Sequence, residues 1–204
     1  IAALSGPVLT PSSRVGEPFQ AWMHEWQHVL IEPETDIVLP STFLYAVASP
    51  TAAVLHIDDR HRDRLLYRNG PLARVAGYAD RGRSALSILS VDLRGWGDTA
   101  PAMFPYEISG WAGIDRYLAY TSAALGDSIM GMRIRDALAA LAYLRTREEV
   151  LPDRIVLTGT GLGGIVALHV AAIDAAVSGV VVWDCPVSIA DLISTEDYTW
   201  PADT

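Results

Sequence analysis

The sequence is poor in cysteine, in basic residues and in long apolar runs. Cys185 is the only cysteine of the 204 residues, so no internal disulfide can form, and no cysteine–histidine spacing indicates a zinc or other metal site. The 15 lysine and arginine residues stand against 24 aspartate and glutamate residues, a net charge of −9. This acidic balance argues against nucleic acid as a partner. No apolar run reaches the roughly 18–20 residues of a membrane helix, and no signal peptide is visible.

The chain does contain enough apolar sequence for one folded domain. Half of its residues are hydrophobic and 19% are charged, a balance typical of packed globular proteins. It starts at Ile1 rather than at methionine, and it stops at Thr204 in a segment that resembles the middle of a loop. We therefore expect trimming upstream and a parent chain that continues past Thr204. The compartment stays open between bacterial cytoplasm and secretion, because many secreted bacterial proteins also lack disulfides.

Strand-like and helix-like patterns alternate along the chain. Residues 1–27 are expected to form an irregular lead-in, in which 17–29 fit a short helix or a first strand, and 28–204 the core domain. The patterns predict strands over 28–31, 36–48, 52–57, 86–91, 154–158 and 179–184, and helices over 71–83, 117–125, 130–146 and 165–173. The first two strands would form a hairpin, and Pro152-Asp153 would break the chain. This order predicts an α/β fold, doubly wound around a mostly parallel sheet with helices on both faces.

The most informative segment is a glycine-rich turn between a predicted strand and a predicted helix. Residues 158–164 are Thr-Gly-Thr-Gly-Leu-Gly-Gly. Tight strand-to-helix turns need small residues because the two backbones approach closely, and the amides at the helix start can stabilise negative charge. Two different kinds of site use this arrangement.

The first interpretation is a nucleophile elbow of the form Gly-x-Ser-x-Gly. Gly159 and Gly163 occupy the two outer positions, with Gly164 next to them. Gly161 stands where the nucleophilic serine would be, and the amide of Leu162 would stabilise an oxyanion. In this interpretation the site has kept its backbone and lacks its nucleophile.

The second interpretation is a dinucleotide-binding turn. Gly159, Gly161 and Gly164 satisfy Gly-x-Gly-x-x-Gly after a strand and before a helix. Asp184 ends the next strand, at about the place where a ribose-binding acid would lie. Several strands precede this turn, however, whereas in a nucleotide fold it usually follows the first strand.

The segments before the turn resemble the α/β-hydrolases, in particular the acetyl-xylan-esterase-like and dipeptidyl-peptidase-like branch. Residues 91–99, Val-Asp-Leu-Arg-Gly-Trp-Gly-Asp-Thr, are similar to that family's Asp-x-Arg-Gly-x-Gly-x-Ser/Thr turn after its fourth strand. Residues 132–155 resemble the helix and lead-in before the elbow strand, and 36–45 resemble an early strand pair without its glycine. The resemblance spans about 28–193. It implies an α/β-hydrolase fold that is incomplete at its C-terminal end and lacks the last strands.

The resemblance implies a serine mechanism, for which the sequence lacks most groups. A serine esterase needs a nucleophile, an acid and a histidine base in that order along this fold. Gly161 has no side chain, and no histidine follows the last predicted strand; the five are His24, His28, His56, His61 and His169. Asp184 is a possible acid or equally a turn residue. The oxyanion amides would come from Leu162 and from the loop around Asp59.

Other polar residues near these motifs have simpler expected roles. Asp92 and Arg94 would hold their turn together, and Cys185 would be a buried, inert thiol. His56 would lie in the core or on a sheet face, and His169 would be packed or face solvent. Thr160 lies next to the serine position, but its side chain would point elsewhere at the turn.

The leading expectation is a carbohydrate-esterase-like protein whose full-length relatives cleave acetyl or similar esters, and which is inactive here because Gly161 replaces serine. The undisturbed glycine run favours a natural rather than an engineered glycine. The alternatives are a non-catalytic domain that binds carbohydrate or a partner protein, and a dinucleotide-binding module. In the leading case no cofactor is needed and the ligand is a small-molecule or carbohydrate ester. Open sheet edges would favour a homo-oligomer.

Overall fold

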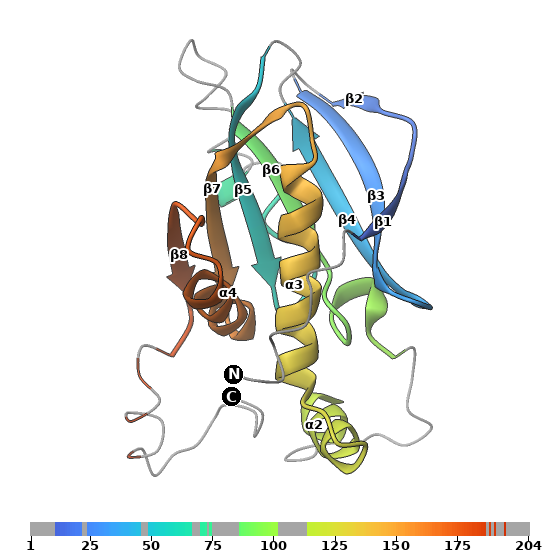
Figure 1. Ribbon diagram of the computed structural model, residues 1–204, viewed down its shortest axis with the longest axis vertical. Coiled ribbons are helices and arrows are strands. Elements are labelled where there is room, and N and C mark those ends of the chain that lie inside the picture. Colours follow the sequence, from blue (N-terminus) through green and yellow to red (C-terminus); the bar gives the residue numbers. More distant parts are fainter. Residues whose placement is uncertain are drawn as a thin grey trace.

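The computed structural model describes residues 11–21, 24–45, 49–66, 70–72, 74, 86–101, 114–186, 188, 190 and 194. The first ten residues of the expected lead-in and most of the expected helix at 71–83 lie outside these ranges. So do residues 102–113. In the described part, a single mixed sheet of eight strands carries helices on one face (Figure 1).

The sheet has an antiparallel half and a parallel half. Its strand order is β1-β3-β4-β6-β5-β7-β8, with β2 paired to β3. The pairs β1–β3, β2–β3, β3–β4 and β4–β6 are antiparallel. The pairs β6–β5, β5–β7 and β7–β8 are parallel. The strands are β1 Ser12–Val15, β2 Phe19–Ala21, β3 His24–Glu34, β4 Ile37–Tyr45, β5 Thr51–Asp58, β6 Leu86–Val91, β7 Val150–Thr160 and β8 Gly179–Trp183. The parallel half therefore contains the strand that leads into the glycine turn.

The N-terminal hairpin is longer than the sequence pattern predicts. β3 and β4 stay paired up to Glu34 and Ile37, so the turn contains only Thr35 and Asp36. Asp36 takes a left-handed conformation with φ of 65°. In the segment 17–29, left open between helix and strand, residues 19–21 belong to β2 and residues 24–29 to β3.

The break predicted at Pro152-Asp153 is wrong, because β7 runs through both residues. Its pairing with β5 shifts register between Thr51 and Ala53, so the extra residues of β7 bulge out there. Proline is tolerated at such a point because an irregular ladder needs no N–H from it. Beyond the bulge β7 pairs regularly up to Thr160, which fixes the position of the turn that follows.

Two long helices cover one face of the sheet. α3 (Ile129–Arg145) packs on β3, β5 and β7, and α4 (Leu162–Ile173) packs on β7, β8 and α3. Figure 1 shows both in front of the sheet, with α2 (Ile114–Ala124) at the lower end of α3. The hydroxyl of Ser128 caps α3 by accepting the N–H of Gly131. No helix in the described ranges is long and apolar enough to cross a membrane.

Strand β5 shows how the two faces differ. Ala53, Leu55 and Ile57 point into the core beneath α3 and α4. The alternate residues His56 and Asp58 are buried on the other side of the sheet, as period-two geometry requires. On that second face a smaller apolar cluster contains Leu44, Val54, Leu65, Leu66, Leu72 and Ile88. The helix predicted at 71–83 lies mostly outside the described residues.

Candidate functional site

The glycine turn forms a sharp strand-to-helix elbow at the carboxyl end of β7. β7 ends at Thr160, α4 begins at Leu162, and Gly161 joins them with φ of 59° and ψ of −131°. This is a left-handed backbone conformation that residues other than glycine rarely adopt. The N–H of Gly161 donates to the carbonyl of Trp183, and the carbonyl of Gly161 accepts from the N–H of Gly164.

The glycines on both sides of the tip are required by close backbone approach. A Cβ added to Gly159 would lie 2.5 Å from the carbonyl oxygen of Gly163. A Cβ on Gly163 would lie 2.4 Å from the carbonyl oxygen of Ile57 on the neighbouring strand β5. Since neither contact can be relieved by rotating a side chain, glycine is required at both positions.

The side chain of Asp59 reaches into the elbow from the loop after β5. Its Oδ2 atom accepts the N–H of Leu162, the first residue of α4, at 3.0 Å. A Cβ built on Gly161 would lie only 2.0 Å from the same oxygen. The carboxylate thus occupies the space in which a side chain at position 161 would begin. The sequence predicts a backbone amide from this loop, and its two consecutive aspartates at a strand end are the one local sign of the side-chain contact.

The two neighbouring aspartates have opposite electrostatic environments. Burial raises the pKa of Asp59, the charge of Asp58 adds to this, and the Leu162 amide only partly offsets it. Burial would also raise the pKa of Asp58, but His56 and Arg64 together lower it overall. The guanidinium of Arg64 donates to Asp58 at 2.7 Å, and the N–H of Arg60 donates at 2.9 Å. Asp58 is therefore held as an ion, while Asp59 is the more easily protonated carboxyl group.

Two of the histidines have the simple roles expected of them. His56 is fully buried on the sheet face, its Nδ1 lies 2.9 Å from the hydroxyl of Thr158, and its ring stacks on Trp183. Burial lowers the pKa of His56, so it stays neutral at pH 7. His169 is exposed on α4, with Nδ1 2.9 Å from the carbonyl oxygen of Ile165.

The remaining candidates for chemistry are not assembled around the elbow. Asp184 is exposed, has φ of 51°, and has no histidine partner among the described residues. Thr160 is 3% exposed, too buried to attack a ligand. Cys185 packs beside the elbow, where a Cβ on Gly164 would lie 2.8 Å from its sulfur. Burial and the charge of Asp59 raise the pKa of Cys185, which disfavours the reactive thiolate.

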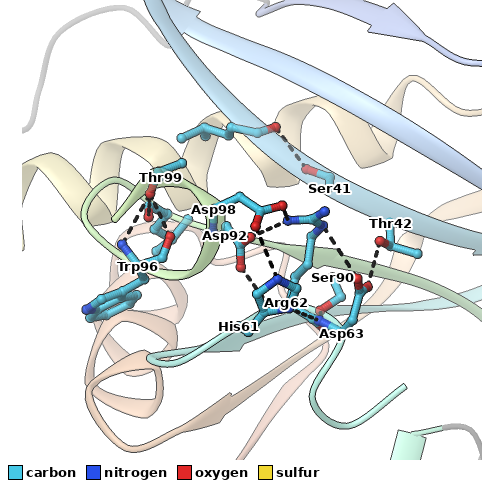
Figure 2. A network of polar contacts seen from close by, with 12 residues as sticks. Ser41, Thr42, His61, Arg62, Asp63, Ser90, Asp92, Trp96, Asp98 and Thr99 are labelled. Carbon is cyan, nitrogen blue, oxygen red and sulfur yellow. Dashed lines mark hydrogen bonds and ion pairs between the residues drawn. The ribbon is translucent and has the colours of Figure 1, made fainter. Parts of the chain in front are cut away.

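A second polar network surrounds Arg62, beside the turn after β6 (Figure 2). The guanidinium of Arg62 donates to the buried carboxylate of Asp92 and, at 2.7 Å, to Asp98. Asp92 also accepts the backbone N–H groups of Arg62 and Asp98. One ligand atom each of His61, Asp92 and Asp98 lie within 4.8 Å of one another, a spacing that suits a cation. Because Arg62 already supplies a positive charge there, we assign the network to holding the turn together.

Arg94 fastens the same turn to two other elements. It donates to Asp136 on α3 and to Glu34 at the end of β3. The expectation that Asp92 and Arg94 are structural is confirmed by these contacts.

Comparisons with known proteins match the chain to hydrolases. The sequence profile of the dienelactone hydrolase family matches residues 119–202, the part of the chain that contains the elbow. The candidate hydrolase YtaP of Bacillus subtilis strain 168 is 45% identical over 49 residues, which are 24% of this chain and 16% of YtaP.

Solved structures of esterases share the fold over most of this chain. A candidate acetyl xylan esterase of Bacteroides fragilis superposes with a TM-score of 0.66 at 16% identity, covering 84% of this chain and 47% of its own. Acetyl xylan esterase 1 of Thermoanaerobacterium sp. gives 0.62 at 15% identity, covering 83% and 51%. A glucuronoyl esterase of Solibacter usitatus gives 0.57 at 15% identity, covering 84% and 51%. The chain thus spans about half the length of the solved esterases it matches.

Fold and comparisons together define the class of protein: the chain has the α/β-hydrolase fold, in the arrangement found in these esterases. Within that class, the segment from α2 to beyond β8 is the part that matches the dienelactone hydrolase family.

Proposed function

We propose that the chain is the elbow-bearing part of a carbohydrate-esterase-like protein, in which position 161 is the nucleophile position and glycine abolishes serine catalysis. The observation that carries the proposal is the conformation of Gly161, a left-handed residue between a parallel strand and a helix. A nucleophile elbow has this strained strand-to-helix geometry. Without a hydroxyl group at its tip, no acyl-enzyme can form there.

The surroundings of the elbow support inactivity as well. Two of the described histidines are held by other contacts: the Nδ1 of His56 lies 2.9 Å from the Thr158 hydroxyl, and that of His169 lies 2.9 Å from the carbonyl oxygen of Ile165. Neither is available as a general base for a group at position 161. A water molecule would therefore need another base to attack an ester bound at this site.

Esters of carbohydrates are the ligand class that we favour. The solved relatives of the same fold are described as acetyl xylan and glucuronoyl esterases. Because this chain spans about half of their length, the substrate of a whole protein stays part of the proposal. The ligand that we propose for this chain is a small-molecule or carbohydrate ester.

A non-catalytic binding domain is the second candidate, and the occupied elbow favours it. The turn keeps every glycine that its backbone needs, yet Asp59 fills the space at its tip. A fold kept without its reactive group suits binding better than turnover. The dinucleotide alternative is weaker, because a carboxylate on the first amide of α4 would repel the phosphate that such a turn must hold.

Calorimetric titration with an acetylated xylo-oligosaccharide, followed by mass spectrometry of the recovered sugar, tests the proposal. We expect saturable binding and a sugar that keeps all its acetyl groups. The deacetylated oligosaccharide is the matched control for the acetyl groups. Release of acetate by the unmodified chain would contradict the proposed inactivity, and no binding of either sugar would contradict the ligand class.

A further inference from the structure

The contact between Asp59 and the elbow joins residues that are 103 positions apart in the sequence. Helix-capping side chains usually come from the residue just before the helix, which here is Gly161 and has none. The capping group of α4 is instead delivered by a loop after another strand. Among the described residues, the Leu162 amide is the one hydrogen-bond donor to the Asp59 carboxylate.

This carboxylate occupies two positions that must be free in a hydrolase of this type. Its Oδ2 lies 2.0 Å from where a Cβ of residue 161 would be, so it fills the place of a nucleophilic side chain. The same oxygen accepts the amide of Leu162, so it also takes the donor that an acyl oxyanion would use. A single internal group thereby stands in for both the nucleophile and the charged intermediate.

We propose that Asp59 is an internal occupant of the elbow, which closes it to acyl groups and other anions. This inference rests on the proposed assignment of the elbow. Gly161 and Asp59 form a matched pair: a side chain at 161 can be accommodated only if Asp59 moves, and the Leu162 amide is free only if Asp59 leaves.

The charged groups around the contact define how firmly it holds. Asp58 is fixed by Arg64 and lies beside Asp59 in the chain, and its charge disfavours a second negative charge nearby. Arg60 and Arg64 oppose this effect. The amide of Leu162 is thus the specific partner that holds Asp59 in the elbow.

A double-mutant cycle on thermal stability tests the steric half of the proposal. Gly161→Ala strains the left-handed backbone in any background, but it meets the carboxylate only when Asp59 is present. We expect the Tm loss caused by Gly161→Ala to be larger with Asp59 than in the Asp59→Gly background, by at least about 3 °C. Equal losses would overturn the proposal. Gly126→Ala is the control, because it has a positive φ and nothing within 4 Å. Asp59→Ser serves as the background if Asp59→Gly does not fold.

Nuclear magnetic resonance of the Leu162 amide, titrated with sodium acetate, tests the electrostatic half. In the unmodified chain we expect the resonance to stay in place, because the amide is already occupied. In Asp59→Gly it should move saturably with acetate, and in Asp59→Asn, whose side-chain carbonyl can still accept, it should stay. A shift in the unmodified chain, or none in Asp59→Gly, would overturn the proposal. Neither experiment involves an ester, so the proposed function can fail in the oligosaccharide titration while this contact stands, and the reverse.

Discussion

The guanidinium of Arg94 is fixed by the buried carboxylate of Asp136. Its Nε donates to Asp136 at 2.8 Å, and the backbone N–H of Arg94 donates to the same carboxylate at 3.2 Å. Asp136 has no solvent exposure, and Arg94 also contacts Glu34. The pair therefore ties the turn after β6 to helix α3 and to the N-terminal hairpin.

Asp136→Ala is expected to destabilise the fold by about 3–5 kcal/mol, because it leaves Arg94 without its buried partner. The free energy of unfolding from urea titration measures this effect. Asp127→Ala is the matched control, since the pair of Asp127 with Arg135 is partly exposed and should cost about 1 kcal/mol or less. Similar losses of unfolding free energy for the two substitutions would show that the buried pair of Arg94 and Asp136 contributes no more than an exposed ion pair.

Gly97→Ala should be far more damaging than Gly126→Ala. Both glycines are left-handed, with φ of 54° and 83°, so each substitution carries about 1–2 kcal/mol of backbone strain. Only at Gly97 would the new Cβ also meet a side chain, 2.2 Å from the carboxylate carbon of Asp92. We expect a further cost of about 1–3 kcal/mol there, measured by urea denaturation of both variants. A smaller loss at Gly97 than at Gly126 would mean that the Asp92 network is not rigid.

The opposite pKa shifts of Asp58 and Asp59 predict opposite effects of pH on stability. The pKa of Asp59 is raised in the folded state, so its contribution is greatest at low pH and is lost as pH rises through the folded pKa, above 3.8. The pKa of Asp58 is lowered, so its contribution is present above 3.8 and is lost as pH falls below it.

Carbon-13 titration of the two carboxyl groups measures these shifts directly, and we expect Asp59 to titrate above Asp58. Asp59→Asn should gain stability relative to the unmodified chain as pH rises from 3 toward 6, because the buried charge is absent. Asp153→Asn, an exposed acid on β7, provides the control. The reverse order of titration would refute the electrostatic description of the elbow.

Much of the parallel half could be predicted from sequence, because its signals are local. The apolar runs at β5, β6 and β8 and the period of α3 follow from nearest-neighbour patterns. The exact course of β7 could not be predicted. A proline that breaks a regular strand is tolerated at a bulge, and the bulge is seen only in the pairing of β7 with β5. The antiparallel half was foreseen as a hairpin, but not as half of the sheet, because strand order depends on contacts distant in sequence.

The elbow itself was predictable, since a glycine run between a strand and a helix is a local pattern, although the approach of Gly163 to Ile57 on β5 appears only in the fold. The role of Asp59 was not, because its partner Leu162 is remote in the chain and only tertiary structure brings them together. The network of Arg62 with Asp92 and Asp98 was missed in part for the same reason: Arg62 belongs to the loop after β5, whereas the aspartates follow β6. The assignment of position 161 as a nucleophile position stays a prediction.

The most direct test of the central claim is the initial rate of p-nitrophenyl acetate hydrolysis by the unmodified chain. Gly161→Ala and Asp59→Asn are run in parallel, because a rate that comes from the elbow must respond to them. With glycine at the tip and Asp59 on the Leu162 amide, all three proteins should match the buffer rate. Saturable hydrolysis by the unmodified chain would contradict the account, and if both variants kept that rate, the site would have to lie elsewhere on the molecule.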